Sequence, residues 1–184
     1  MNAINTRTRG IDIVFNGKWK INKTRLELIM AAGFNRNAIY GPIKTTAPIS
    51  DTVRYRNTLF GVEEITTLEN DQPRKKIIFS GTISKGRFGF VFRNTLFGNT
   101  ATATIVRNPT DTLYNSFSSK ILTDISINYT PKSWMVITVG ANNIFNVYPD
   151  PLLNRNSGTI NYSSGATPFG SNGGYYYVSM RLNF

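Results

Sequence analysis

The sequence predicts an all-β fold of about seven antiparallel strands, arranged up and down as in a segment of a transmembrane β-barrel wall. Three observations predict it. Apolar and polar residues alternate with period two over segments of about ten residues, which is the pattern of a strand with one apolar face. Short turns and long connections alternate between these segments, so all long connections fall at one end of an antiparallel sheet. Aromatic residues of the apolar phase gather at the other end.

Composition excludes several classes of protein. The 184 residues contain no Cys and no His, so there is no disulfide, no thiolate metal site and no histidine-dependent nucleophile. No uncharged apolar run reaches the roughly 18 residues of a membrane helix, whereas a spanning strand needs only about 9–11. An enzyme is conceivable only through carboxylates, Lys or Tyr, and we expect no catalytic residue, no metal and no cofactor.

The chain is basic, with a formal net charge of +11. Its 21 basic residues are spread along the sequence, and the longest basic run is Arg74-Lys75-Lys76. This spread favours solvated loops and strand ends over a nucleic-acid partner. The first residues are too polar for a secretory signal peptide, so we expect that one was removed or that the chain begins inside a longer protein.

The first two predicted strands cover about residues 9–19 and 24–34, with the dipeptides Gly17-Lys18 and Asn22-Lys23 bracketing a short turn. A helix over 25–32 is an alternative, because Leu, Glu, Met and Ala are good helix formers. Charges on only one parity favour the strand. A long connection, 35–72, follows and is rich in acidic residues: Asp51, Glu63, Glu64, Glu69 and Asp71.

The third and fourth predicted strands, 74–84 and 87–97, are joined by a tight turn at Lys85-Gly86, where glycine supplies a positive φ. A connection over 98–119 leads to the fifth and sixth, about 121–129 and 135–142, with a proline-containing turn at 130–133. A Gly-, Ser- and Asn-rich loop, 143–174, precedes the last strand, 175–184.

The two faces of these strands differ in a way that favours lipid on one side. No charge is expected on the apolar face, although a soluble β-sandwich would also segregate charge. Four aromatic residues of the apolar phase lie at the short-turn end and resemble an interfacial girdle: Trp19, Phe88, Tyr129 and Phe184. The opposite face is small and hydroxylic, as at Ser80, Thr82 and Thr138, which suits a lumen. Because single-chain bacterial barrels have an even number of strands, seven strands predict a piece of a larger barrel.

Three stretches resemble the C-terminal part of TonB-dependent outer-membrane receptors, the Bacteroidetes-type sequences in particular. They are the strand opening at 2–12, the segment 139–150 with its Asn-Ile-Phe-Asn-x-Tyr-Pro motif, and Pro168-Phe169-Gly170 followed by the closing strand 175–184. The resemblance implies that the chain is one domain, 1–184, from a barrel of about 22 strands. The signal peptide, plug domain and earlier barrel strands of the family have no counterpart here.

The resemblance also implies a function and a location. The parent protein would lie in the bacterial outer membrane and import a scarce large nutrient, such as an iron–siderophore, cobalamin or a glycan. TonB would supply energy through the absent plug domain. The expected partners are outer-membrane lipid, lipopolysaccharide and the barrel-assembly machinery, which would recognise alternate residues of the last strand: Tyr176, Val178, Met180, Leu182 and Phe184.

Two further sets of residues are candidate contacts. The long loops offer possible ligand-binding residues: Arg54, Tyr55, Arg56, Tyr148, Arg155 and Tyr162. The basic run Arg74, Lys75 and Lys76 is placed to contact lipopolysaccharide phosphates. The alternative function is a soluble β-sandwich that binds carbohydrate. An enzyme using Asp124 or Glu27 ranks third, because no constellation of side chains supports it.

Overall fold

The computed structural model describes residues 4–43, 60–105, 111–153, 162 and 167–183. This part of the chain is almost entirely antiparallel β-structure with one short helix. The elements in chain order are β1 (Asn5–Ile21), β2 (Thr24–Tyr40), α2 (Val62–Asn70), β3 (Lys75–Lys85), β4 (Phe88–Phe97), β5 (Thr100–Ile105), β6 (Thr112–Phe117), β7 (Lys120–Lys132), β8 (Met135–Asn142) and β9 (Tyr175–Leu182).

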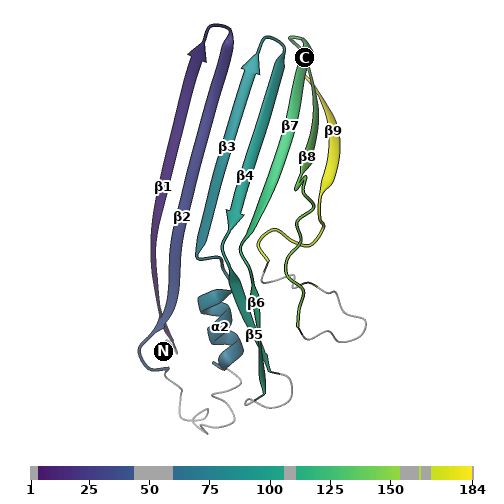
Figure 1. Ribbon diagram of the computed structural model, residues 1–184. Coiled ribbons are helices and arrows are strands. Elements are labelled where there is room, and N and C mark those ends of the chain that lie inside the picture. Colours follow the sequence, from purple (N-terminus) through teal and green to yellow (C-terminus); the bar gives the residue numbers. More distant parts are fainter. Residues whose placement is uncertain (1–3, 44–59, 106–110, 154–161, 163–166, 184) are drawn as a thin grey trace.

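Seven strands form a single sheet in the order β1-β2-β3-β4-β7-β8-β9, with every neighbouring pair antiparallel. All seven predicted strands are therefore confirmed, and they pair in chain order. The hairpin β5–β6 is inserted between β4 and β7 and forms its own two-stranded sheet. Figure 1 shows the seven strands side by side, with β5–β6 beyond one end of the sheet. The hairpin does not cover the sheet's face as the second layer of a β-sandwich would.

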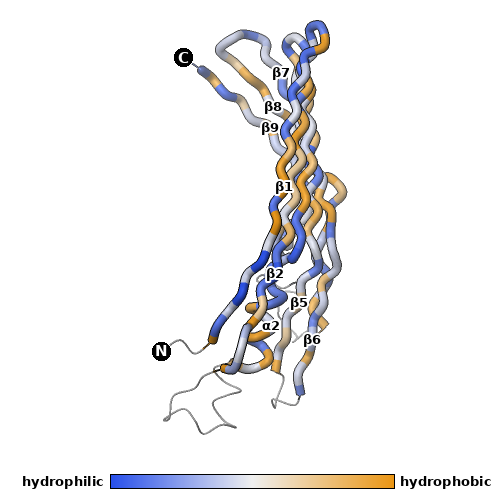
Figure 2. Tube along the Cα trace, turned by 90° about the vertical axis from the view of Figure 1, so that its left-hand side faces the viewer, coloured by the Kyte–Doolittle hydropathy of each residue, from blue (hydrophilic) through white to orange (hydrophobic). Residues whose placement is uncertain are grey.

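Strand register places the predicted apolar positions of all seven strands on one face. A single row of directly opposite residues crosses the whole sheet: Trp19, Leu26, Ile83, Phe90, Ile127, Val139 and Val178. Six of these seven side chains are exposed, from 40% at Phe90 to 74% at Val178, and Leu26 is half-buried. The apolar middle of the sheet is visible in Figure 2. We call this side of the sheet the apolar face.

Short turns join β1 to β2, β3 to β4 and β7 to β8, and the long connections leave from the other end, as predicted. Asn22 and Gly86 adopt positive φ values of 52° and 59° in the first two turns. Two predicted turn positions are wrong. Gly17 belongs to β1, where a Cβ would collide with the ring of Trp19. Likewise, β7 continues to Lys132, through a register shift after Tyr129, because a bulge accommodates the predicted turn residues.

The first two strands extend beyond their predicted limits at the long-connection end. β1 starts at Asn5 and β2 continues to Tyr40, because backbone pairing persists where the hydrophobic alternation has stopped. The observed register corrects the expectation that the apolar face carries no charge. Basic residues of the apolar phase occur at the strand ends: Arg7, Arg9, Arg36, Lys75 and Lys85. Arg7, Arg9 and Arg36 lie beyond the apolar band, and Lys75 and Lys85 lie in its end rows, directly opposite Phe34 and Phe88.

Two connections contain structure that the sequence interpretation missed. The 35–72 connection includes α2, and the 98–119 connection includes both strands of the hairpin β5–β6. Gly98 forms the bend between β4 and β5, and its N–H donates to the Lys75 carbonyl at 2.8 Å. A Cβ at residue 98 would lie 3.0 Å from that oxygen, so the close approach requires glycine. Among the described residues, no helix is long and apolar enough to cross a membrane.

Candidate functional site

The long-connection end of the sheet gathers the polar and aromatic side chains that could contact a ligand. After β8 the chain turns sharply at Asn143, which has a positive φ of 49°. Its backbone N–H donates to Asp124 Oδ1 at 2.8 Å, and its side-chain amide bonds twice to Val147: Nδ2 donates to the carbonyl at 2.8 Å and Oδ1 accepts from the N–H at 2.9 Å. These two hydrogen bonds fix the start of the segment 143–153, which we call the strap.

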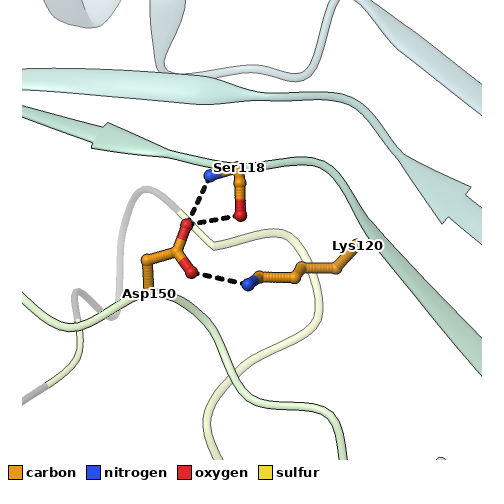
Figure 3. Close-up of polar contacts among 3 residues, drawn as sticks. All are labelled: Ser118, Lys120 and Asp150. Carbon is orange, nitrogen blue, oxygen red and sulfur yellow. Dashed lines mark hydrogen bonds and ion pairs between the residues drawn. The ribbon is translucent and has the colours of Figure 1, made fainter.

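Asp150 fastens the strap to the sheet (Figure 3). Its Oδ2 accepts hydrogen bonds from both the N–H and the hydroxyl of Ser118 at 2.6 Å, and its Oδ1 lies 2.5 Å from Lys120 Nζ. The Lys120 ammonium and the Ser118 hydroxyl stabilise the carboxylate and lower the pKa of Asp150 to about 2. Asp150 therefore stays ionised at neutral pH and holds the strap at the junction of β6 and β7.

Two of the predicted ligand-binding residues are brought together by the strap. Tyr148 and Tyr162 stack with ring centroids 5.7 Å apart and an interplanar angle of 16°. The Tyr148 hydroxyl lies over Gly173, where a Cβ would collide with it. The other four predicted residues, Arg54, Tyr55, Arg56 and Arg155, lie outside the described residues. The Tyr148–Tyr162 pair is the part of the predicted set that the structure assembles.

Helix α2 fills the space between the extension of β2 and β5 (Figure 1). Glu69 Oε1 accepts a hydrogen bond from the backbone N–H of Ile39 at 2.9 Å. Glu63 Oε1 accepts one from the N–H of Ile105 on the other side. The helix thus satisfies one backbone donor on each of the two strands that flank it, β2 and β5. Glu63 also lies in the first helical turn, where the helix dipole stabilises a negative charge.

A hollow of about 810 Å³ opens between α2, β5 and the strap. Carboxylates, hydroxyls and apolar groups line it: Phe60, Glu63, Glu64, Thr67, Leu68, Thr102, Ala103, Thr104 and Leu152. Within the described part of the chain, Glu64 Oε2 is the one buried side-chain oxygen without a hydrogen-bond partner. The lining can contact a ligand that presents hydrogen-bond donors beside an apolar body. Sequence interpretation missed this hollow, and the acidic content of residues 35–72 was its one signal.

The three basic residues predicted to contact lipopolysaccharide have different surroundings. Arg74 Nη2 donates to Asn70 Oδ1 at 2.8 Å. Lys76 Nζ lies 5.3 Å from the centre of the Phe97 ring. Strand alternation places Lys75 on the apolar face and Lys76 on the opposite face. Of these two strand residues, Lys75 shares the face of the apolar row.

The residues predicted to be recognised by the assembly machinery and those of the predicted aromatic girdle belong to the apolar phase of their strands. Tyr176, Val178, Met180 and Leu182 lie on the apolar face of β9, with exposed fractions of 78%, 74%, 62% and 41%. Phe88 and Tyr129 stack with ring centroids 4.9 Å apart at the short-turn end, and Trp19 lies on the same face of the sheet, on β1. Phe184 lies outside the described residues.

The two carboxylates considered for catalysis, Asp124 and Glu27, each contact a different partner. Asp124 accepts the Asn143 N–H, as described above, and Glu27 pairs with Lys18 at 3.0 Å. They lie on different strands, β7 and β2, with β3 and β4 between them. The structure does not bring them together.

Comparison with known proteins gives a fold-level similarity. No protein-family model and no curated protein matches the sequence. A chain in the solved structure of the FpvAI–pyocin S2 complex, in which FpvAI is a TonB-dependent receptor, is similar with a TM-score of 0.62. The similarity covers 98% of the present chain at 13% sequence identity, and 20% of the other chain. The present chain thus has the fold of about one fifth of that chain, an antiparallel segment of β-structure.

Proposed function

We propose that this chain is a wall segment from the C-terminal part of a TonB-dependent outer-membrane receptor. The observation that carries the proposal is the exposed apolar row that crosses all seven strands. A water-soluble sheet would cover such a face with a second layer, because exposed apolar area costs about 25 cal/mol per Å². Packing against lipid removes the same area from water without a second layer.

The dimensions of the apolar face support this assignment. In β1 its apolar positions extend from Ile11 to Ile21, close to the about 9–11 residues that a tilted membrane strand requires. Aromatic residues end the band at the short-turn side, where Phe88 stacks on Tyr129. Short turns at one end and long connections at the other give the layout of transmembrane barrels. The fold-level similarity to a TonB-dependent receptor supports the antiparallel strand layout.

For the parent protein, the proposal is energised import across the bacterial outer membrane. The hollow beside α2 and the Tyr148–Tyr162 pair lie at the long-connection end, which faces the cell exterior in such barrels. They are the proposed contacts for a nutrient such as a siderophore, cobalamin or a glycan. TonB would act through a plug domain, and the barrel-assembly machinery would recognise β9. The proposal assigns this chain no enzymatic step.

Two substitutions on adjacent residues of β9 test the proposal. Val178 lies on the apolar face and is 74% exposed, whereas Ser179 is exposed on the opposite face. An arginine facing lipid near mid-membrane costs about 2–4 kcal/mol, whereas one facing a lumen costs little. Val178→Arg should therefore reduce insertion of the full chain into phosphatidylcholine vesicles by tenfold or more, and Ser179→Arg should leave insertion near the wild-type level.

Insertion is measured by flotation of the vesicles and by protection of the strands from trypsin. Equal insertion of the two variants would contradict the proposal, because an exposed position in water tolerates arginine on either face. A monodisperse, detergent-free wild-type monomer would contradict it more directly.

A further inference from the structure

Three arginines lie together on the apolar face, beyond the end of the apolar band. In the pairing of β1 with β2, Arg9 is directly opposite Arg36. Arg7 lies two residues from Arg9 along β1 and therefore points to the same face. We call Arg7, Arg9 and Arg36 the rim arginines. Figure 2 shows this end of β1 as a hydrophilic stretch next to an apolar one.

Like charges directly opposite each other destabilise an antiparallel pair, since their Cβ atoms are about 4.5–5.5 Å apart. The β1–β2 register nevertheless continues without a shift past Arg9 and Arg36 as far as Asn5 and Tyr40. On this face, β1, β2 and β3 carry no Asp or Glu within their described limits. No ion pair joins a rim arginine to any described carboxylate. An anion from outside these strands would relieve the repulsion.

The surroundings of the rim arginines favour binding over simple solvation. The Arg7 guanidinium lies 4.3 Å from the centre of the Tyr40 ring, and this cation–π contact restricts its orientation. Lys75 lies on the same face of β3, directly opposite Phe34. Glu69, on the helix beside the extension of β2, accepts the Ile39 N–H at the edge of that strand. The cluster therefore keeps its positive charge.

The next residues of the same face are apolar. Ile11 follows Arg9 along β1, and Phe34 precedes Arg36 along β2; the two are themselves directly opposite. An anion held by the rim arginines would thus lie at the end of a surface that can pack against hydrocarbon. A phosphorylated lipid combines a charged headgroup with adjacent acyl chains. Free phosphate and nucleic acids have no hydrocarbon chain that could pack on the apolar band.

We propose that the rim arginines bind the phosphate of a phosphorylated lipid headgroup whose acyl chains lie along the apolar face of β1 and β2. Guanidinium groups suit this role because their forked donors bind phosphate oxygens in pairs. The inference rests on the proposed membrane location. It places the main headgroup contact on Arg7, Arg9 and Arg36, with Lys75 as a neighbour, and not on the run Arg74–Lys76.

A double substitution with a matched control tests the site. Lys20 and Arg25 are also directly opposite each other in β1 and β2, but they lie on the other face and at the short-turn end. Arg9→Gln/Arg36→Gln and Lys20→Gln/Arg25→Gln therefore remove the same charge from the same two strands. The full chain and both variants are inserted into phosphatidylcholine vesicles, with and without bis-phosphorylated lipid A, and lipid retention is measured by native mass spectrometry after extraction into detergent.

We expect Arg9→Gln/Arg36→Gln to weaken lipid A retention by about tenfold or more, because charge-assisted hydrogen bonds to phosphate are lost. The Lys20→Gln/Arg25→Gln variant should retain lipid A as the wild type does. Equal retention by all three proteins, or an equal loss in both variants, overturns the inference. Displacement of lipid A by millimolar inorganic phosphate would show a free-phosphate site and also overturns it.

Insertion into pure phosphatidylcholine separates this test from that of the proposed function. The rim-arginine variant should insert there as well as the wild type. These vesicles contain no lipid A, so the loss of a lipid A site does not affect insertion. Normal insertion with unchanged lipid A retention would reject the lipid site alone. Failure of the wild type to insert would reject the membrane proposal, and the lipid assignment with it.

Discussion

Asp150 joins parts of the chain that are distant in sequence. It accepts from the N–H and hydroxyl of Ser118, which follows β6, and from the ammonium of Lys120, which begins β7. Nothing in the local sequence around Asp150 predicts these contacts, because each partner is about 30 residues away. The Asn143–Val147 amide pair, by contrast, is local and lies in the segment whose motif the sequence made visible.

The Asp150 contacts predict a pH dependence with a definite sign. The pKa of Asp150 in the folded chain is about 2, below the ordinary value of 3.8. The carboxylate therefore contributes stability in full above about pH 4, and this contribution is lost as the pH falls toward 2. Asp150→Asn should lower the free energy of unfolding in detergent micelles at neutral pH. Its difference from the wild type should shrink between about pH 4 and 2.

Circular dichroism during urea unfolding at a series of pH values provides the measurement. Asp111→Asn is the matched control, since Asp111 also lies beside β6 and takes no part in the Asp150 cluster. A wild-type-to-Asp150→Asn difference that stays constant down to pH 2 would show that the Lys120 and Ser118 contacts do not stabilise the folded chain.

At the scale of elements, α2 takes the place of a strand. The pairing of β2 with β3 stops at Phe34 and Lys75, whereas β2 continues to Tyr40. Beyond Phe34, the edge of β2 that faces away from β1 would therefore present unpaired donors. Glu63 and Glu69 accept from one amide on each side of the gap. Such covering of an exposed strand edge prevents pairing with other chains.

This role predicts local changes in hydrogen exchange. Glu69→Ala should speed exchange of the Ile39 amide, and Glu63→Ala that of the Ile105 amide, each by about tenfold, since a hydrogen bond to a charged group contributes about 1.5 kcal/mol. Glu64→Ala is the control on the same helix, because Glu64 accepts from neither amide. Exchange rates that are unchanged in the first two variants, measured by NMR in micelles, would mean that α2 does not protect these edges.

The elements that the sequence predicts well are those facing the proposed lipid. If one side of these strands faces lipid, every second residue must be apolar over the whole span. In β4, for example, Phe88, Phe90 and Phe92 occupy these positions. Beyond the span this requirement ends, so the outer parts of β1 and β2 show no hydrophobic period. β5 alternates only Thr and Ala, and α2 has nine residues, so neither carries a strong pattern. Sequence also indicated Tyr148 and Tyr162 as loop aromatics, but only the folded strap shows that they stack.

At the scale of the whole molecule, the structure is a curved wall with two different faces. One face carries an exposed apolar row, with cations beyond one end and stacked aromatics at the other. The opposite face carries small and hydroxylic groups such as Thr138, which donates to Asn128 at 2.7 Å. Within the described residues, β1 and β9 each pair on one side only. In a larger barrel these edges would pair with further strands, which removes the liability of open edges.

The central claim is that the apolar face contacts lipid, and site-directed spin labelling tests it most directly. The chain has no Cys, so single cysteines can be introduced one at a time along β3, at residues 77–83, without removing a native thiol. In phosphatidylcholine vesicles, we expect oxygen accessibility to be greatest at Ile77, Phe79, Gly81 and Ile83, and that of a water-soluble nickel reagent to be greatest at Ile78, Ser80 and Thr82. The opposite phase, or no alternation along β3, would contradict a lipid-facing wall.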